Sequence, residues 1–236
     1  MLQDPQLLSL IGVGFLLGLR HALDSDHLAA VATVLAERPS LLASGAVGLW
    51  WGIGHTLTLL LVGSVVLAWG IRIPEEFELL AESGVAVLLI VLGGTLALKL
   101  YRERWHVHKH HHDGEPHIHF HSHHRQEDHR HPHWMIQSIR PLCIGMAHGL
   151  AGSAAVMLMI LSTTKEMGTG LLSILVFGIG SIIGMMVIGL TISVPVIYSR
   201  SINHRLFGAV QGLASIASVS VGIWMLIKLA LSAAGE

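Results

Sequence analysis

The sequence has little charge, few aromatic residues and almost no cysteine. Of its 236 residues, 12% are charged and 6% are aromatic, and Cys143 is the only cysteine. Soluble domains carry about 25% charged residues, so an ordinary water-soluble enzyme and a disordered chain are both excluded. A net charge of −1 does not supply the basic surface of a nucleic-acid-binding protein. A single cysteine excludes a disulfide framework and a CxxC thiol relay.

Apolar residues, by contrast, are abundant. They make up 52% of the chain, and the mean hydropathy is +0.64. A helix that crosses a bilayer needs about 20 mostly apolar residues in a row. Six runs reach that length, over residues 6–36, 41–69, 79–101, 135–163, 168–198 and 206–231. The sequence therefore predicts an all-α, polytopic membrane protein with six transmembrane helices.

Lysine and arginine are distributed unevenly between the loops that join these runs. Ten lie in or beside the loops after the first, third and fifth runs, and three lie in or beside the others. Cytoplasmic loops carry the excess of these two residues. We therefore expect a protein of the cell (inner) membrane, with these three loops in the cytoplasm and both termini outside.

The two halves of the sequence resemble each other. GLRHALDSDHLAAV, from Gly18, aligns with GMAHGLAGSAAVML, from Gly145, and WGIGHT, from Trp51, aligns with FGIGSI, from Phe177. Similar offsets across three spans indicate a duplicated three-helix unit, over residues 1–101 and 135–236. Because three is odd, the second unit inserts upside down. Inverted repeats are typical of transporters, whose substrate site lies near the midplane between the repeats.

Ionisable residues gather inside the first run. Of the fifteen acidic residues, only Asp24 and Asp26 fall well inside a predicted span, where His21 and His27 flank them. A charge at mid-bilayer costs at least a few kcal/mol, so such residues usually face a cavity and have a function. On a regular helix Asp26 points away from the other three, whereas an unwound segment lets all four converge. The alternative is a structural ion pair between Arg20 and Asp24.

Two further histidines extend this candidate site. His55 lies in the glycine-flanked WGIGHT stretch, and His148 is the repeat mate of His21; each could instead form a simple interhelical hydrogen bond. Imidazoles combined with carboxylates suit Ni²⁺, Co²⁺ or Zn²⁺, whereas Mg²⁺ and Ca²⁺ prefer oxygen ligands. Ser153 and Ser181 are supporting candidates. The predicted metal ligands are His21, Asp24, Asp26, His27, His55 and His148.

The loop over residues 102–134 holds thirteen of the eighteen histidines. Its composition cannot build a core, so we expect it to be disordered without ligand. Dense imidazoles bind several borderline metals, Zn²⁺ among them, and favour a cytoplasmic metal buffer or donor. Their spacing does not fit a closed structural zinc site, which usually includes cysteines.

Two of these motifs resemble those of the nickel/cobalt transporter family, in its urease-accessory-type nickel permease subgroup. RHALDSDHLAAV is similar to the family's HAxxxDH signature, and GIGHTLTLL to its Gly-His-Ser/Thr motif on the following helix. The resemblance implies transport of Ni²⁺ or Co²⁺, with His21, Asp26 and His27 as signature residues and His55 as the histidine of the partner helix. The acidic motif of the family's later helices is not evident, and HGLAGSAA stands in its place.

Residues and resemblance together predict a transporter and not an enzyme. We expect uptake of Ni²⁺ first and Co²⁺ second, driven by the inside-negative potential, with no resident cofactor. The expected partners are the ion, the lipid bilayer and cytoplasmic metallochaperones for a nickel enzyme, and no nucleic acid. The alternatives are a metal efflux protein of the same fold, a membrane metal sensor or storage protein that uses the His-rich loop, and an intramembrane metalloenzyme.

Overall fold

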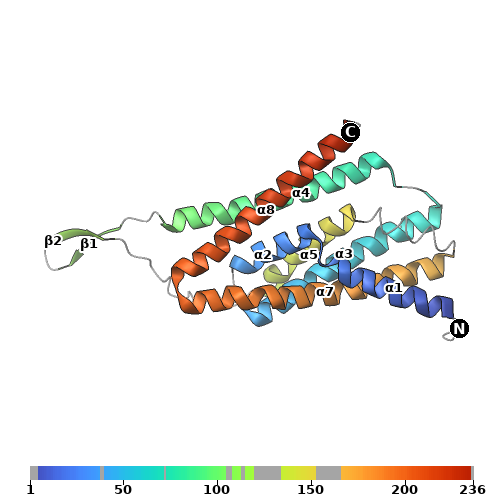
Figure 1. The fold of residues 1–236 in the computed structure, drawn as a ribbon, viewed down its shortest axis with the longest axis horizontal. Helices are drawn as coiled ribbons and strands as arrows, with labels where there is room; N and C mark the ends of the chain where they lie inside the picture. The colour runs from blue at the N-terminus through green and yellow to red at the C-terminus, as the bar shows by residue number, and fades with distance from the viewer. Residues whose placement is uncertain are drawn as a thin grey trace.

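A computed structural model describes residues 5–37, 40–71, 73–104, 108–112, 115–119, 134–152 and 166–234. In these ranges the chain forms helices and one small hairpin (Figure 1). The helices are α1 (Pro5–His21), α2 (Ser25–Glu37), α3 (Leu41–Trp69), α4 (Glu75–Arg104), α5 (Trp134–Ala151), α7 (Met167–Ile202) and α8 (His204–Ala233). Strands β1 (His108–His112) and β2 (Glu115–His119) pair antiparallel.

Four helices in the described ranges are long and apolar enough to cross a membrane: α3, α4 as far as Arg102, α7 and α8. They coincide with the second, third, fifth and sixth predicted runs, and α3 has the bounds predicted for the second. Large apolar side chains such as Leu61, Val187 and Ile216 are exposed on their outer faces, as expected for helices that face lipid. The predicted all-α fold is confirmed for these ranges, and the six-span inverted repeat stays a prediction.

The first predicted run is two helices instead of one. α1 ends at His21, residues 22–24 form a turn and bend, and α2 begins at Ser25. The sequence explains the position of the break, because Asp and Ser side chains compete with helical hydrogen bonds and favour helix starts. Asp26 lies in the first turn of α2, where the helix dipole stabilises an acidic side chain. The single span predicted over residues 6–36 is therefore replaced by an interrupted one.

The fourth predicted run begins as α5 and also stops near its middle. α5 ends at Ala151, and Gly152 forms a turn whose N–H donates to the carbonyl of His148. The rest of that run, residues 153–165, lies outside the described residues, as does the candidate Ser153. The two predicted runs that carry the aligned His21 and His148 motifs are thus the ones in which a helix ends part-way.

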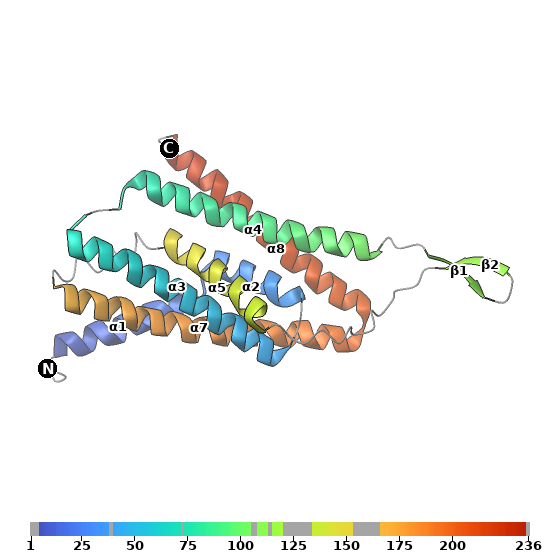
Figure 2. The same cartoon turned by 180° about the vertical axis from the view of Figure 1, so that it is seen from behind.

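Helices from the two halves of the sequence pack against each other. α1 lies along α7, α3 contacts both α5 and α7, and α4 pairs with α8, as Figure 2 shows from behind. Ser215 and Ser218 of α8 donate to backbone carbonyls of α4, the kind of interhelical hydrogen bond that holds membrane helices together. The hairpin lies at one end of the bundle, while α1 begins and α8 ends at the other (Figure 1).

Candidate metal centre

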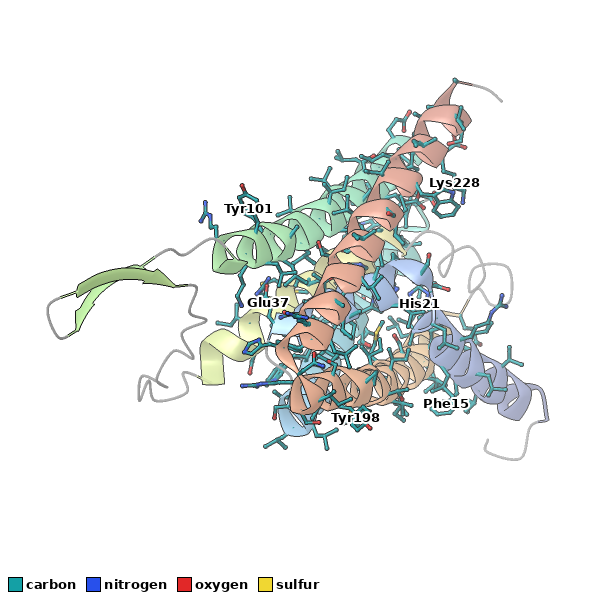
Figure 3. All side chains as sticks on the ribbon, turned by 60° about the vertical axis from the view of Figure 1, so that its left-hand side comes forward. Phe15, His21, Glu37, Tyr101, Tyr198 and Lys228 are labelled. Carbon is teal, nitrogen blue, oxygen red and sulfur yellow. The ribbon has the colours of Figure 1, made fainter. Side chains whose placement is uncertain are left out.

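Four histidines from four helices meet inside the bundle. His21 ends α1, His27 lies in α2, His55 in α3 and His148 in α5; we call them the four-histidine cluster. The ring of His21 is 4.7 Å from that of His27 and 4.9 Å from that of His55, and the rings of His27 and His148 are also 4.9 Å apart, measured between centroids. Figure 3 shows His21 at the inner end of α1, beside the break that leads into α2.

The cluster is almost entirely removed from solvent. His27, His55 and His148 are at most 2% exposed, and the His21 side chain is 17% exposed. One nitrogen from each of His21, His27 and His55 can be chosen so that all three lie within 4.8 Å of one another. Three imidazoles at this spacing can share one ion, because a metal–nitrogen bond is about 2.0–2.1 Å long.

Carboxylates hold two of these rings by their Nδ1 atoms. Nδ1 of His21 lies 2.7 Å from Oδ2 of Asp24, and Nδ1 of His27 lies 3.3 Å from Oδ1 of Asp26. An ionised carboxylate only accepts hydrogen bonds, so Nδ1 carries the proton in both rings. Nε2 is then the nitrogen with a free lone pair. Metal-binding histidines commonly have this second-sphere arrangement.

The other two histidines complete the pattern. Nδ1 of His148 donates to the carbonyl oxygen of Ile144 at 3.0 Å, which again leaves Nε2 as the acceptor. Among the described residues, Nε2 of all four histidines is buried without a hydrogen-bond partner, and so is Nδ1 of His55. Buried polar atoms are nearly always satisfied. So many unpartnered nitrogens in one place therefore indicate that a bound species satisfies them.

The two aspartates differ in depth. The Asp26 side chain is 24% exposed, and its Oδ2 lies 3.9 Å from Nε2 of His148. Asp24 is 52% exposed and contacts His21. Both aspartates also form a group with His27 whose ligand atoms lie within 4.8 Å of one another. The structural ion pair between Arg20 and Asp24 is not formed, since Asp24 pairs with His21 and Arg20 is exposed.

The structure thus brings all six predicted ligands into one region, and it adds neighbours that the sequence reasoning missed. Trp51 is fully buried, with its ring 5.0 Å from that of His148. The ring of Phe177 lies 5.4 Å from that of His21. The repeat alignment pairs Trp51 with Phe177, and this was the available signal that both line the site.

Two buried hydroxyls lie on the helices around the cluster. Oγ of Ser181, an expected supporting residue, and Oγ1 of Thr56, which was not singled out, have no hydrogen-bond partner among the described residues. The two described strands of the His-rich loop lie away from this site, because they project from one end of the bundle (Figure 2).

Glycines permit the helix crossings that create the cluster. A side chain at Gly145 would overlap the carbonyl of Trp51, and one at Gly149 would place Cβ 2.6 Å from the carbonyl oxygen of His55. Both glycines lie within one turn of His148. A Cβ at Gly18, one turn before His21, would likewise overlap the carbonyl of Phe177. The histidines therefore meet only because backbone contacts backbone at these points.

Comparison with known proteins identifies a family and two relatives. The family model described as "NicO: High-affinity nickel-transport protein" matches residues 7–234. The chain is 36% identical over 217 residues to the urease accessory protein UreH of Bacillus sp. (strain TB-90), a match that covers 91% of this chain and 90% of that protein. It is 32% identical over 101 residues to the high-affinity nickel transport protein of Cupriavidus necator, covering 41% of this chain and 26% of that one. No solved structure matches.

Proposed function

The chain belongs to the family of high-affinity nickel-transport proteins, and we propose that it takes up Ni²⁺, with Co²⁺ as a second substrate, through the four-histidine cluster. Membership confirms the family resemblance, the transport of a metal ion across a membrane and the expectation that the chain is not an enzyme. The preference for Ni²⁺ over Co²⁺, the inward direction of transport and the location of the metal site are our proposals.

One observation carries the proposal: four neighbouring histidines each bury an Nε2 atom without a hydrogen-bond partner among the described residues, and ligand nitrogens of three of them, His21, His27 and His55, lie within 4.8 Å of one another. Neutral imidazole nitrogen is a preferred ligand of Ni²⁺, Co²⁺ and Zn²⁺. Asp26 supplies a negative charge next to His27 and His148. Four nitrogens and one carboxylate suit a dehydrated borderline cation, whereas an apolar solute or an anion would leave the nitrogens unsatisfied.

The proposed ligands become less exposed from Asp24 inward, and this order supports a route for the ion into the bundle. Asp24 is the most exposed of the six proposed ligands, followed by Asp26 and His21, while the other histidines are buried. A hydrated ion would first meet Asp24 and His21 and would then exchange water for the imidazoles of His27, His55 and His148. Each exchange replaces a water ligand, so the ion does not cross the apolar interior bare.

We also propose an inward direction. Inside-negative potential favours entry of a divalent ion by about 2 × 2.3 kcal/mol per 100 mV, and the sequence contains no GxxxxGK[ST] nucleotide motif. The end of the bundle that carries the hairpin would be cytoplasmic, and the end where α1 begins and α8 ends would be outside.

A metallochaperone for a nickel enzyme is the proposed recipient of the ion, in line with the name of the urease accessory relative.

We propose further that the two halves form an inverted repeat with the site between them. Equivalent glycines make equivalent contacts. Gly18 meets the Phe177 carbonyl as Gly145 meets that of Trp51, and these partners are themselves aligned in the repeat.

The same pairing recurs elsewhere in the bundle. Gly54 meets the carbonyl of Leu142 as Gly180 meets that of Phe15. α1 and α3 therefore contact α7 and α5 in matching ways, which supports a two-fold relation between the halves. The site then draws His21, His27 and His55 from the first half and His148 from the second.

The proposal is tested by ⁶³Ni²⁺ flux into proteoliposomes with an imposed inside-negative potential. We expect wild-type uptake to be lost in His27→Ala and His55→Ala and retained in His204→Ala, a matched control exposed at the start of α8. Competition by unlabelled Co²⁺ and Zn²⁺ ranks the metals, and reversal of the potential reports the direction. Unchanged flux in both cluster variants contradicts the site, and efflux against an inside-negative potential contradicts uptake.

A further inference from the structure

Two aromatic residues each cover one histidine of the four-histidine cluster. The ring of Trp51 lies 5.0 Å from that of His148, and the ring of Phe177 lies 5.4 Å from that of His21, measured between centroids. The repeat alignment pairs Trp51 with Phe177 and His148 with His21. Each half of the chain therefore supplies one ring that covers a histidine of the other half.

The two rings lie at different levels along the bundle. α3 begins at the hairpin end and α7 begins at the opposite end (Figure 1). A Cβ at Gly178 of α7 would overlap the side chain of Thr56 of α3, which lies five residues beyond Trp51. Phe177 is therefore displaced from Trp51 by about 7.5 Å at the helical rise per residue. Side chains tilt toward the N-terminus of their helix, so the tilt moves the two rings further apart.

The histidines occupy the space between these two levels. A Cβ at Gly145 would overlap the carbonyl of Trp51, and one at Gly149 would crowd that of His55. His148 lies between the two glycines in α5, so its level is between those of Trp51 and His55. A path along the bundle from one end to the other therefore passes one ring, then the histidines, then the second ring.

The two sides of the cluster are not equally closed. Trp51 is fully buried, and so is the side chain of His148. On the other side Phe177 is 4% exposed, the His21 side chain is 17% exposed, and the adjoining Asp24 is half exposed. The structure is therefore closed at the ring of Trp51 and slightly open beside that of Phe177.

The indole nitrogen of Trp51 makes its closed position unfavourable. Within the described part of the chain, Nε1 is buried and has no hydrogen-bond partner. This N–H can only donate, and a buried donor without an acceptor costs free energy. Water would satisfy it if the ring moved toward the hairpin end. The equivalent Phe177 has no such group, so only one of the two rings carries this cost.

We propose that Trp51 and Phe177 are the gating residues of the metal path, with Trp51 as the inner gate on the cytoplasmic side and Phe177 as the outer gate. The proposal rests on the proposed uptake function and on the inverted repeat, in which the two halves rock to open one side at a time. The unpaired indole N–H favours opening of the inner gate, and therefore release of the ion into the cytoplasm.

The test labels a thiol in the cluster from each side of the membrane. Cys143→Ser removes the native cysteine, and Ser181→Cys places a reporter at a fully buried position. A membrane-impermeant methanethiosulfonate reagent is added to right-side-out and to inside-out membrane vesicles. Removal of a ring shifts its gate toward the open state, so we expect about tenfold faster labelling. Trp51→Ala should show this from the cytoplasmic side only, and Phe177→Ala from the outer side only.

Matched controls and a milder variant separate gating from general loosening. Trp50→Ala, half-buried on a different face of α3, and Phe207→Ala, half-buried in α8, should label as the background protein does. Trp51→Phe keeps an aromatic ring and removes the unpaired N–H. It should therefore fold normally, label more slowly than the background from the cytoplasmic side and take up radiolabelled Ni²⁺ more slowly.

Several outcomes would overturn the two gates. These are labelling from the same side in both alanine variants, labelling from the reversed sides, and unchanged cytoplasmic labelling in Trp51→Phe. Labelling needs no metal. Sided labelling in a background protein that takes up no Ni²⁺ therefore contradicts the proposed function alone, whereas normal uptake with unsided labelling contradicts the gates alone.

Discussion

Gly149→Ala tests whether close contact between α3 and α5 sets the geometry of the proposed site. A Cβ at this position would lie 2.6 Å from the carbonyl oxygen of His55, whereas ordinary contacts begin at 3.4 Å. The two helices must therefore separate by about 0.8 Å. Functional sites must be held within about 0.5 Å of their working geometry, and α3 and α5 carry His55 and His148.

Two magnitudes follow from this displacement. Overpacking of this kind costs about 1–3 kcal/mol of stability. Loss of ligand orientation lowers metal affinity by about 10–100-fold, so we expect Ni²⁺ uptake at sub-saturating concentration to fall at least tenfold. Gly94→Ala on α4 is the control, because nothing lies within 4 Å of its Cβ position.

Radiolabelled Ni²⁺ uptake into proteoliposomes measures the first effect, and the unfolding midpoint in detergent measures the second. The protein should remain folded, since the three tight contacts of this Cβ, with the carbonyl oxygen and Cα of His55 and with Cβ of Thr58, all lie at one crossing with α3. Wild-type uptake by a correctly folded Gly149→Ala protein would refute the argument that this crossing positions the histidines.

Three further predictions concern polar side chains of the bundle. Asp26→Asn should lower Ni²⁺ uptake much more than Asp24→Asn, because Asp26 contacts two cluster histidines whereas Asp24 is half exposed and contacts one; equal loss in the two variants would contradict this. Arg140→Ala should lower the free energy of unfolding by less than about 1 kcal/mol, since its ion pair with Glu37 is partly exposed; the denaturation midpoint checks it. Ser181→Ala should leave that midpoint unchanged, because its hydroxyl has no partner to lose within the described residues, and a clear drop would reveal an unseen one.

The sequence predicted the long helices accurately because their apolar runs are bounded by plain signals. α3 starts after the Pro39–Ser40 dipeptide and ends at Trp69, where Gly70 adopts a left-handed conformation. The grouping of His21 with Asp24 and His27 was also predictable, because those residues are close together in the sequence, on either side of the break between α1 and α2. Such signals are local, and a local signal can be read from one sequence.

Tertiary features could not be derived in the same way. Hydropathy alone does not show that the run through Asp24 and Asp26 breaks, since the residues on both sides remain apolar. The contact between Asp26 of α2 and His148 of α5 depends on where these two helices lie relative to each other, and a single sequence contains no direct measure of that placement. Trp51 was missed for a related reason: a tryptophan in an apolar run usually packs against lipid or core, and its alignment with Phe177 does not by itself place its ring beside His148.

The proposed repeat accounts for the uneven distribution of the proposed metal ligands between the two halves of the bundle. Equivalent helices cross in equivalent ways, yet Ala151 and Ser181 occupy the positions that correspond to Asp24 and His55. A second set of acids would place more negative charge in the interior than one divalent ion can neutralise, and uncompensated buried charge is costly. His148 is the proposed ligand from the second half, and a neutral imidazole there would contribute nitrogen without adding charge. A two-fold scaffold with the proposed ligands concentrated in one half would therefore bring both halves to a single cation.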